Sequence, residues 1–355
     1  MPSNTLFSDK IAIAASNAGK PIDVSQYRFL DKIAESYTPI LIGFGGSHAY
    51  GTNIESSDTD IRGIAMNTID EAILGKDYEQ FVNNATDTTI YSFLKMMKLL
   101  TECNPNTIEI LGLKPEHYLY KSDIGQYILD NSQMFLSQRC FDTFGGYAMQ
   151  QMYRLRQKTL AAIPEDELNK HISSVMNNML KQLKEQYHID NISTAVIDGK
   201  ITVNVDVKNY PMEDLSSVLG IINKTLTDYR KRSIRNDKAM THGKIAKHSM
   251  HLLRLYMMAE DLLLDGKIVT YREKEHDFLM DIRFGKYLDE TGSPNKDFFD
   301  IVDSYKARFE HAKTHSVLPK KPDIDKINRF ITSVFKNEVI NNMPKNANIG
   351  KKIKK

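Results

Sequence analysis

The stretch that decides the fold is "TPILIGFGGSHAYGTNIESSDTDIRG", residues 38–63. It opens with a short apolar run that starts after Pro39 and ends in glycines, which predicts a buried strand leading into a tight turn. A short helix is expected to begin at Ser47. The segment "SDTDIRGIAM" then alternates apolar and polar residues, which predicts a second strand. We therefore expect strand, glycine turn, helix and strand in close succession.

Two common nucleotide-binding motifs do not match this turn. A dinucleotide fingerprint needs a third glycine where His48 stands and an acidic residue about 20 positions on, near Ala65 and Met66. A P-loop needs Gly-Lys-Ser/Thr, which does not follow the turn. What remains is a glycine turn with a short helix and, after it, the pair Asp58 and Asp60.

This arrangement favours a phosphate site beside a metal site. Backbone N–H groups at a helix start can bind phosphate, and glycines let a polyphosphate approach closely. On a strand, Asp58 and Asp60 would point to the same face and could bridge divalent cations. Nucleotidyl transfer uses such a pairing, with two metal ions about 3.5 to 4 Å apart. A D-x-D pair alone is often only a solvated turn, but its place after an apolar strand and glycine turn favours function.

Composition excludes several other classes of protein. The chain has 355 residues, of which 41% are apolar, so two domains are expected. Lys and Arg total 47 against 45 Asp and Glu, so net charge gives no general attraction to nucleic acid or membrane. Cys103 and Cys140 form no CxxC pair, and no apolar run approaches the ~18 residues that span a bilayer. We predict a soluble, cytoplasmic protein without membrane contact.

The pattern along the chain predicts an α+β fold. In the first part, "DTTIYSF" predicts a third strand that leads into an amphipathic helix, which Pro105 then ends. A β-hairpin is expected around Asp198-Gly199, because Ile201, Val203 and Val205 alternate with polar residues. Helical periodicity predicts the remaining elements at residues 123–160, 165–188, 213–231, 243–265, 275–286, 295–313 and 322–340.

At residues 43–63 the sequence resembles the DNA polymerase beta superfamily of nucleotidyltransferases. Its longer form, "GGSHAYGTNIESSDTDIRG", looks like the RlaP-like branch, labelled as an RNA repair pathway family. The segments "NPNTIEIL" at 104–111 and "LPKKPD" at 318–323 look like the same branch, as do 135–158 and 246–267. The resemblance implies a small mixed-sheet nucleotidyltransferase domain at 1–120. The residue pattern predicts that a mostly helical domain follows at 121–342, with an insertion around 160–240, and that the basic tail at 343–355 is disordered.

The resemblance also implies roles for individual residues. Gly45, Gly46 and Ser47 would hold the nucleotide phosphates. Asp58 and Asp60 would bind two Mg²⁺ ions. A third carboxylate is expected from a neighbouring strand. Asp87 is the first candidate, because about 27 residues after Asp60 suffice for a returning strand, and Glu109 is its rival.

Basic residues supply further candidates. On a helix, one face of residues 244–254 carries Lys244, Lys247, His248, His251 and Arg254. This stripe is either a solvated face or, as the resemblance favours, a cleft wall in which Lys244, His248 and Arg254 contact the nucleotide. The basic residues of "YRKRSIR" at 229–235 either interact with the dipole at a helix C-terminus or form a patch that binds RNA phosphates.

Two further pairs of residues are candidates for binding a ligand. His48 and Tyr50 could contact the nucleotide or pack the turn. His311 and His315 are four residues apart, but no further metal ligand accompanies them.

The sequence thus predicts a Mg²⁺-dependent nucleotidyltransferase that uses an NTP such as ATP and binds RNA. The acceptor hydroxyl is expected at an RNA 3′ end, with tRNA as the first candidate. The alternatives are a protein or small-molecule acceptor, or a non-catalytic module that senses nucleotide or RNA on the same fold. The sequence does not specify the oligomeric state.

Overall fold

The computed structural model describes most of the chain and divides it into two compact units. The described residues are 5–75, 78–159, 173, 177, 180, 192–198, 200–205, 211–212, 215–216, 218–220, 222–223 and 242–342. One unit comprises 1–150, 250–281 and 299–355, and the other comprises 151–249 and 282–298. The predicted domain borders at residues 120 and 342 remain predictions.

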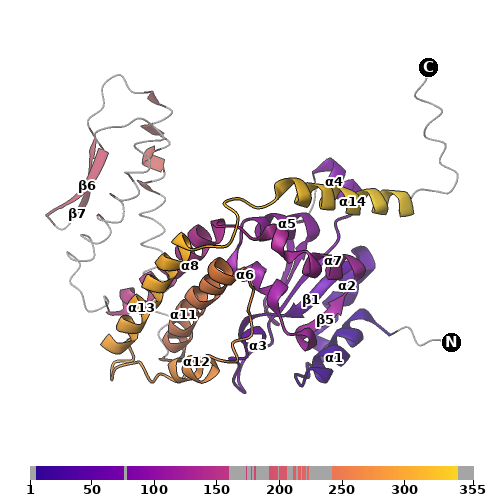
Figure 1. Cartoon of the computed structure of the whole chain (residues 1–355), viewed down its shortest axis with the longest axis horizontal. Coiled ribbons are helices and arrows are strands. Elements are labelled where there is room, and N and C mark those ends of the chain that lie inside the picture. Colours follow the sequence, from indigo (N-terminus) through magenta and orange to yellow (C-terminus); the bar gives the residue numbers. More distant parts are fainter. Residues whose placement is uncertain are drawn as a thin grey trace. The chain divides into compact units, whose positions relative to one another are not determined.

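A five-stranded mixed sheet forms the centre of the first unit (Figure 1). Its order is β3 (Gln80–Asn83), β4 (Thr88–Ser92), β2 (Ile61–Ala65), β1 (Pro39–Phe44) and β5 (Tyr118–Lys121). β2 and β4 run parallel, and the other neighbours are antiparallel. The mixed sheet confirms the predicted α+β class.

Strand β1 is buried on both faces, as the continuous apolar run predicted. Ile42 and Phe44 belong to a core cluster with residues of α1 and α2, whereas Leu41 lies near Gly125 of α7 on the other face. Side chains of a strand alternate between faces, so one apolar run serves both layers. The helices of this part are α1 (Phe7–Asn17), α2 (Phe29–Ser36), α3 (Gly46–Tyr50), α4 (Ile69–Leu74), α5 (Phe93–Thr101), α6 (Pro105–Ile108) and α7 (Asp123–Asp130).

One side chain, that of Ser92, caps helix α5 directly after strand β4. The Ser92 hydroxyl accepts the N–H of Lys95 at 3.1 Å and caps the helix. The helix ends at Thr101, and Pro105 starts the separate short helix α6. The predicted strand, helix and break are therefore confirmed.

The other long helices agree with the predicted segments within a few residues, apart from one interruption. The predicted segment 123–160 is divided, because α7 ends at Asp130 and α8 begins at Arg139. Predicted helices at 165–188 and 213–231 lie largely outside the described residues. The remaining helices are α8 (Arg139–Thr159), α11 (His242–Asp265), α12 (His276–Arg283), α13 (Lys296–Thr314) and α14 (Ile324–Asn342).

The predicted β-hairpin is present in the second unit. Strands β6 (Ile192–Ile197) and β7 (Lys200–Val205) pair antiparallel, and Asp198 at the turn has φ 49°. Aspartate tolerates this left-handed conformation better than most residues. The turn signal in the sequence was sufficient to locate the hairpin.

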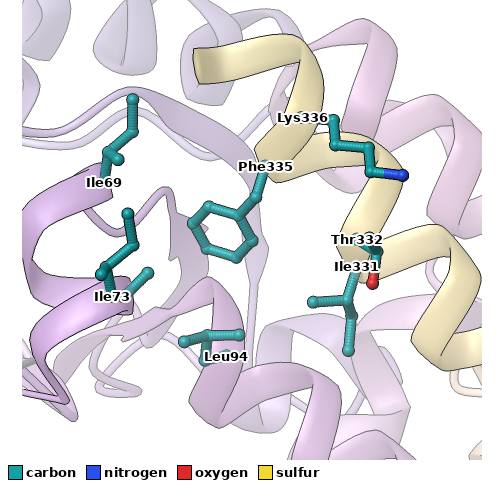
Figure 2. A pocket seen from close by; sticks show the side chains of 8 residues that line it. Ile69, Ile73, Leu94, Ile331, Thr332, Phe335 and Lys336 are labelled. Carbon is teal, nitrogen blue, oxygen red and sulfur yellow. The ribbon is translucent and has the colours of Figure 1, made fainter. Parts of the chain in front are cut away.

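An apolar groove of about 500 Å³ lies between helices α4 and α14 of the first unit. Figure 2 shows Phe335 reaching toward Ile69 and Ile73, with Leu94 below. Among its lining residues only Lys336 is charged. Such a lining suits apolar packing rather than a triphosphate.

Two predictions from composition can be compared with the structure. Both cysteines are buried and free of disulfides. Within the described ranges, every helix is too short or too polar to cross a membrane.

We predict that Gly125→Ala lowers the free energy of unfolding by about 1–3 kcal/mol, as overpacking commonly does. A Cβ at Gly125 would overlap the carbonyl oxygen of Ile40, which is backbone and cannot move aside cheaply. Gly146→Ala, in helix α8, is the matched control because a Cβ there meets nothing within 4 Å. The control is expected to gain up to about 1 kcal/mol of helix propensity. Urea unfolding followed by circular dichroism measures both, and equal changes would contradict the packing argument.

Candidate functional site

The glycine turn after β1 lies directly against Asp60. The Gly45 N–H donates to the carbonyl oxygen of Asp60 at 2.8 Å. Gly46 has φ 53°, and a Cβ added to it would overlap Oδ2 of Asp60. Both the backbone angle and the space exclude a side chain at Gly46. The turn therefore brings the carboxylate of Asp60 against the start of helix α3.

The two aspartates precede strand β2 rather than lying on it, which corrects the prediction. β2 begins at Ile61, and helix α3 begins at Gly46 instead of Ser47. β1 ends at Phe44 and turns into α3, so residues before Asp60 have no β1 partner for a ladder. We predicted that Asp58 and Asp60 point to the same face because side chains alternate along a strand. Asp58 does not lie on a strand, so that reason does not apply to it.

Asp58 and Asp60 nevertheless lie near one common side chain. Asp58 is exposed, whereas Asp60 is only 9% exposed. The Tyr27 hydroxyl donates to the carbonyl oxygen of Thr59, between them, at 3.3 Å. Burial raises the pKa of Tyr27, and the charges of Asp60 and Asp58 raise it further. Both carboxylates are thus within electrostatic reach of the same phenol.

Asp87 lies at the same edge of the sheet as Asp60. Ile61 pairs with Thr88 in the parallel ladder, so Asp60 and Asp87 each immediately precede a paired residue. Arg62 holds Asp87 there, because its Nη2 lies 3.3 Å from Oδ1 and its Nη1 donates to the Asp87 carbonyl oxygen. The Asp87 side chain is 61% exposed. This placement agrees with the neighbouring strand expected for a third carboxylate.

Glu109, the rival carboxylate, is buried in the first unit. It lies in the 3₁₀ turn η2 (Glu109–Gly112) and is 7% exposed. Burial raises the pKa of Glu109, while the charge of Arg254, interaction with the Tyr50 hydroxyl, the charge of Arg62 and the backbone of Gly46 oppose that rise.

Tyr50 and Arg254, both predicted nucleotide ligands, contact each other inside the first unit. The Arg254 guanidinium carbon lies 3.3 Å from the centre of the Tyr50 ring, a cation–π contact. The two residues are only 4% and 7% exposed. Arg254 also lies close to His251, with Nη2 3.0 Å from Nδ1. Their direct contact with nucleotide remains a prediction.

Lys20, which lies outside every predicted motif, contacts helix α3. Ser47 and His48 are buried. The Lys20 amine lies 3.0 Å from Nδ1 of His48 and 3.1 Å from Oδ1 of Asn53. Burial lowers the pKa of Lys20. No motif surrounds Lys20, so only the tertiary fold reveals this contact.

The other basic candidates lie elsewhere in the chain. Lys244 and His248 belong to the second unit, where Lys244 is exposed and Nδ1 of His248 lies 3.1 Å from Oε1 of Gln151. The segment 229–235 lies outside the described residues. His311 and His315 stack at the end of α13, with ring centres 3.9 Å apart.

A bound Mg²⁺ ion would need oxygen ligands from this site. Among the residues that the structure describes, no three acidic, His or Cys side chains are gathered closely enough to hold a metal. Mg²⁺ is, however, commonly bound through one or two carboxylates together with water and substrate phosphates. The donors present at Asp58 and Asp60 fit that chemistry, although the complete set is not preassembled in the protein alone.

Comparison with known proteins identifies the segment that carries this site. Residues 25–195 match the model of the RlaP family, described as an RNA repair pathway DNA polymerase beta family. The matched segment contains the glycine turn, both aspartates, Asp87 and Glu109. The predicted resemblance to this family is thereby confirmed for residues 25–195.

One relative, a phage protein, aligns with most of the chain. An uncharacterized 38.9 kDa protein from the nrdC-mobD intergenic region of Enterobacteria phage T4 is 21% identical over 350 residues. The alignment covers 83% of this chain and 96% of the phage protein. No solved structure matches the chain.

We predict that Gly46→Ala is more destabilising than Gly75→Ala. Both glycines have left-handed φ angles, 53° and 62°, so each alanine would cost about 1–2 kcal/mol of backbone strain. Only at Gly46 would the Cβ also overlap Asp60, which adds about 1–3 kcal/mol. Gly75 is the matched control because nothing lies within 4 Å of its added Cβ. Urea unfolding measures the difference, and equal losses would refute close packing of Asp60 on Gly46.

Proposed function

We propose that the protein is a Mg²⁺-dependent nucleotidyltransferase that moves an NMP from an NTP to an acceptor hydroxyl. The observation that carries this proposal is the carboxylate of Asp60 lying against Gly46, with Asp58 two residues away. This arrangement joins a glycine turn, suited to phosphate, to carboxylates suited to a divalent cation. The match to the RlaP family supports the same class of reaction.

In this proposal the triphosphate lies against Gly45, Gly46 and Ser47 at the start of α3. Asp58 and Asp60, with Asp87, would hold two Mg²⁺ ions, which when bound supply positive charge to the attacking and leaving oxygens. Arg62 acts by keeping Asp87 beside Asp60 through its ion pair.

The chain's own contribution to the reaction is orientation. The acceptor oxygen bonds to the α-phosphorus and loses its proton, while the bond to the bridging oxygen breaks and pyrophosphate leaves. Such transfers gain most of their rate from positioning and charge stabilisation. A rigid turn and a nearly buried Asp60 fit that requirement.

We predict that Asp58→Asn and Asp60→Asn each lower nucleotidyl transfer by about 10²–10³-fold or more, a loss typical of removing one transition-state contact. Asparagine keeps the size of the side chain but removes the charge that a cation requires. Transfer is measured with labelled NTP, Mg²⁺ and total cellular RNA. Glu35→Gln, at an exposed position on α2, is the control and should keep full activity. A folded Asp58/Asp60 double variant with full activity would refute the assignment.

The acceptor that we favour is an RNA 3′ end, with tRNA as the first candidate. The description of the matched family as an RNA repair pathway family supports RNA. The basic segment 229–235 and the exposed Lys244 and Lys247 supply charge that could bind phosphate, whereas Arg254 is buried. A protein hydroxyl or a small molecule is the alternative acceptor.

If RNA is the acceptor, its affinity should fall steeply with salt. Each neutralised phosphate of a single strand contributes a slope of about −0.7 to log affinity against log salt concentration. We expect a linear plot with a total slope of several units. Fluorescence anisotropy of a labelled RNA at several salt concentrations measures it, and an affinity independent of salt would favour a small acceptor.

A non-catalytic nucleotide sensor is the second candidate. The observation in its favour is that the described residues include no preassembled group of three metal-binding side chains. Incubation with each labelled NTP, Mg²⁺ and either total RNA or total protein separates the two. Nucleotide binding without label in any fraction would support the sensor, whereas a labelled fraction supports the transferase and identifies its acceptor.

A further inference from the structure

The backbone of Lys20 is placed by the end of helix α1. Gly19 has φ 72°, a left-handed conformation that glycine adopts without strain. The N–H of Gly19 donates to the carbonyl oxygen of Ser16 at 2.9 Å, and that of Lys20 donates to the carbonyl oxygen of Ala15 at 2.9 Å. These two bonds form a Schellman arrangement, which commonly ends a helix. Lys20 is therefore held at the point where the chain leaves α1.

The Lys20 ammonium has an acceptor for each of its three N–H groups. Its Nζ lies 3.0 Å from Nδ1 of His48, 3.1 Å from Oδ1 of Asn53 and 3.5 Å from the carbonyl oxygen of His48. A partly buried ammonium requires such partners. Because a lysine ammonium donates and does not accept, Nδ1 of His48 acts as the acceptor. The contact therefore indicates a neutral His48 ring with its proton on Nε2.

The contacts of Lys20 lie on both sides of the glycine turn at residues 45–47. Phe44 ends β1 immediately before the turn, and the Lys20 Nζ lies 5.7 Å from the centre of its ring. His48 follows the turn in α3, and its ring lies against that of Phe44 with centres 5.9 Å apart. Asn53 belongs to the connection from α3 to β2. One side chain thus contacts both flanks of the turn and the segment that leads to the aspartates.

We propose that Lys20 is a positioning residue for the phosphate-binding turn, because it contacts Phe44 before the turn and holds His48 after it in one tautomer. His48 then supports the turn and does not contact the nucleotide. The role rests on the proposed function, since the turn is the proposed phosphate site. A lysine that bound the triphosphate directly would have to leave the three acceptors that it contacts here.

The first test needs neither a Lys20 variant nor a nucleotide. NMR of the full chain with isotope-labelled histidine distinguishes a protonated ring nitrogen from an unprotonated one. The His48 signals are assigned by their absence in His48→Gln. We expect the proton on Nε2 and an unprotonated Nδ1 near neutral pH. A proton on Nδ1, in either the neutral or the charged ring, would overturn the proposal.

Hydrogen exchange tests whether Lys20 fixes the structure around the turn. The N–H groups of Ala49, Gly51 and Thr52 form backbone hydrogen bonds within α3 and at its end. Lys20→Met should speed their exchange at least about tenfold, because hydrogen bonds from a charged donor are lost. Lys10→Met, at an exposed position on α1, is the matched control and should change it less than about twofold. Unchanged exchange in folded Lys20→Met would contradict the positioning role.

The same measurement separates a local effect from a general loss of stability. Residues 88–92 form strand β4 of the same sheet and have no printed sequence neighbour among the Lys20 contacts, so their exchange in Lys20→Met should stay within about twofold. Acceleration of β4 equal to that of α3 would mean that Lys20 only stabilises the fold, and the proposal would be wrong.

Transfer activity gives an independent reading. A positioning role predicts that Lys20→Met lowers kcat at least about tenfold, since a small misplacement of the substrate is costly. The KM for the NTP should stay within about threefold. A larger rise in KM, with unchanged exchange of α3, would make Lys20 a phosphate ligand and refute the positioning role.

A double variant tests whether Lys20 acts through His48. Lys20→Met and His48→Gln remove the same contact, so together they should lower kcat at least about threefold less than the product of the two single effects. Effects that simply multiply would contradict the proposal. If Lys20→Met does not fold, NMR of the unmodified chain still decides the tautomer. If the unmodified chain transfers no nucleotide, the proposed function fails, whereas NMR and hydrogen exchange still decide the role of Lys20.

Discussion

The site depends on a close approach that only glycine permits. The carboxylate of Asp60 occupies the space into which any side chain at Gly46 would project. The Gly45 N–H also bonds to the backbone of Asp60, so the turn after β1 and the start of β2 are joined at two points. The turn between strand β1 and helix α3 is therefore fixed against Asp60 at the start of strand β2. A rigid turn beside a carboxylate is what positional catalysis of phosphoryl-group transfer requires.

A second constraint acts through charge. Glu109 is buried and would be costly without partners, because a desolvated carboxylate loses its hydration. Arg254, from helix α11, balances it and stacks on Tyr50 of α3. Residues far apart in the sequence thus meet beside helix α3. Residues 250–281, which include Arg254, belong to the same compact unit as the sheet.

Local patterns predicted most of the elements and their order. The apolar run predicted β1, the β-branched run predicted β4, and the turn with alternating residues predicted the hairpin. Strands β3 and β5 were not predicted, since "QFVN" and "YLYK" are too short for a periodic signal. Asp58 was placed on a strand, although the ladder starts only at Ile61. Strand ends depend on a partner strand, which alternation alone does not specify.

By itself, the sequence determined the α+β class, the glycine turn with its two aspartates, and the family of residues 25–195. Those features are local, because backbone freedom at glycine and alternation along a strand act over a few residues. The tertiary structure decided the surroundings of the turn. It placed Asp87 at the edge beside Asp60, and Glu109 and Arg254 in the interior. A helical pattern shows which residues share a face. Only packing shows whether that face meets solvent, a cleft or a buried carboxylate.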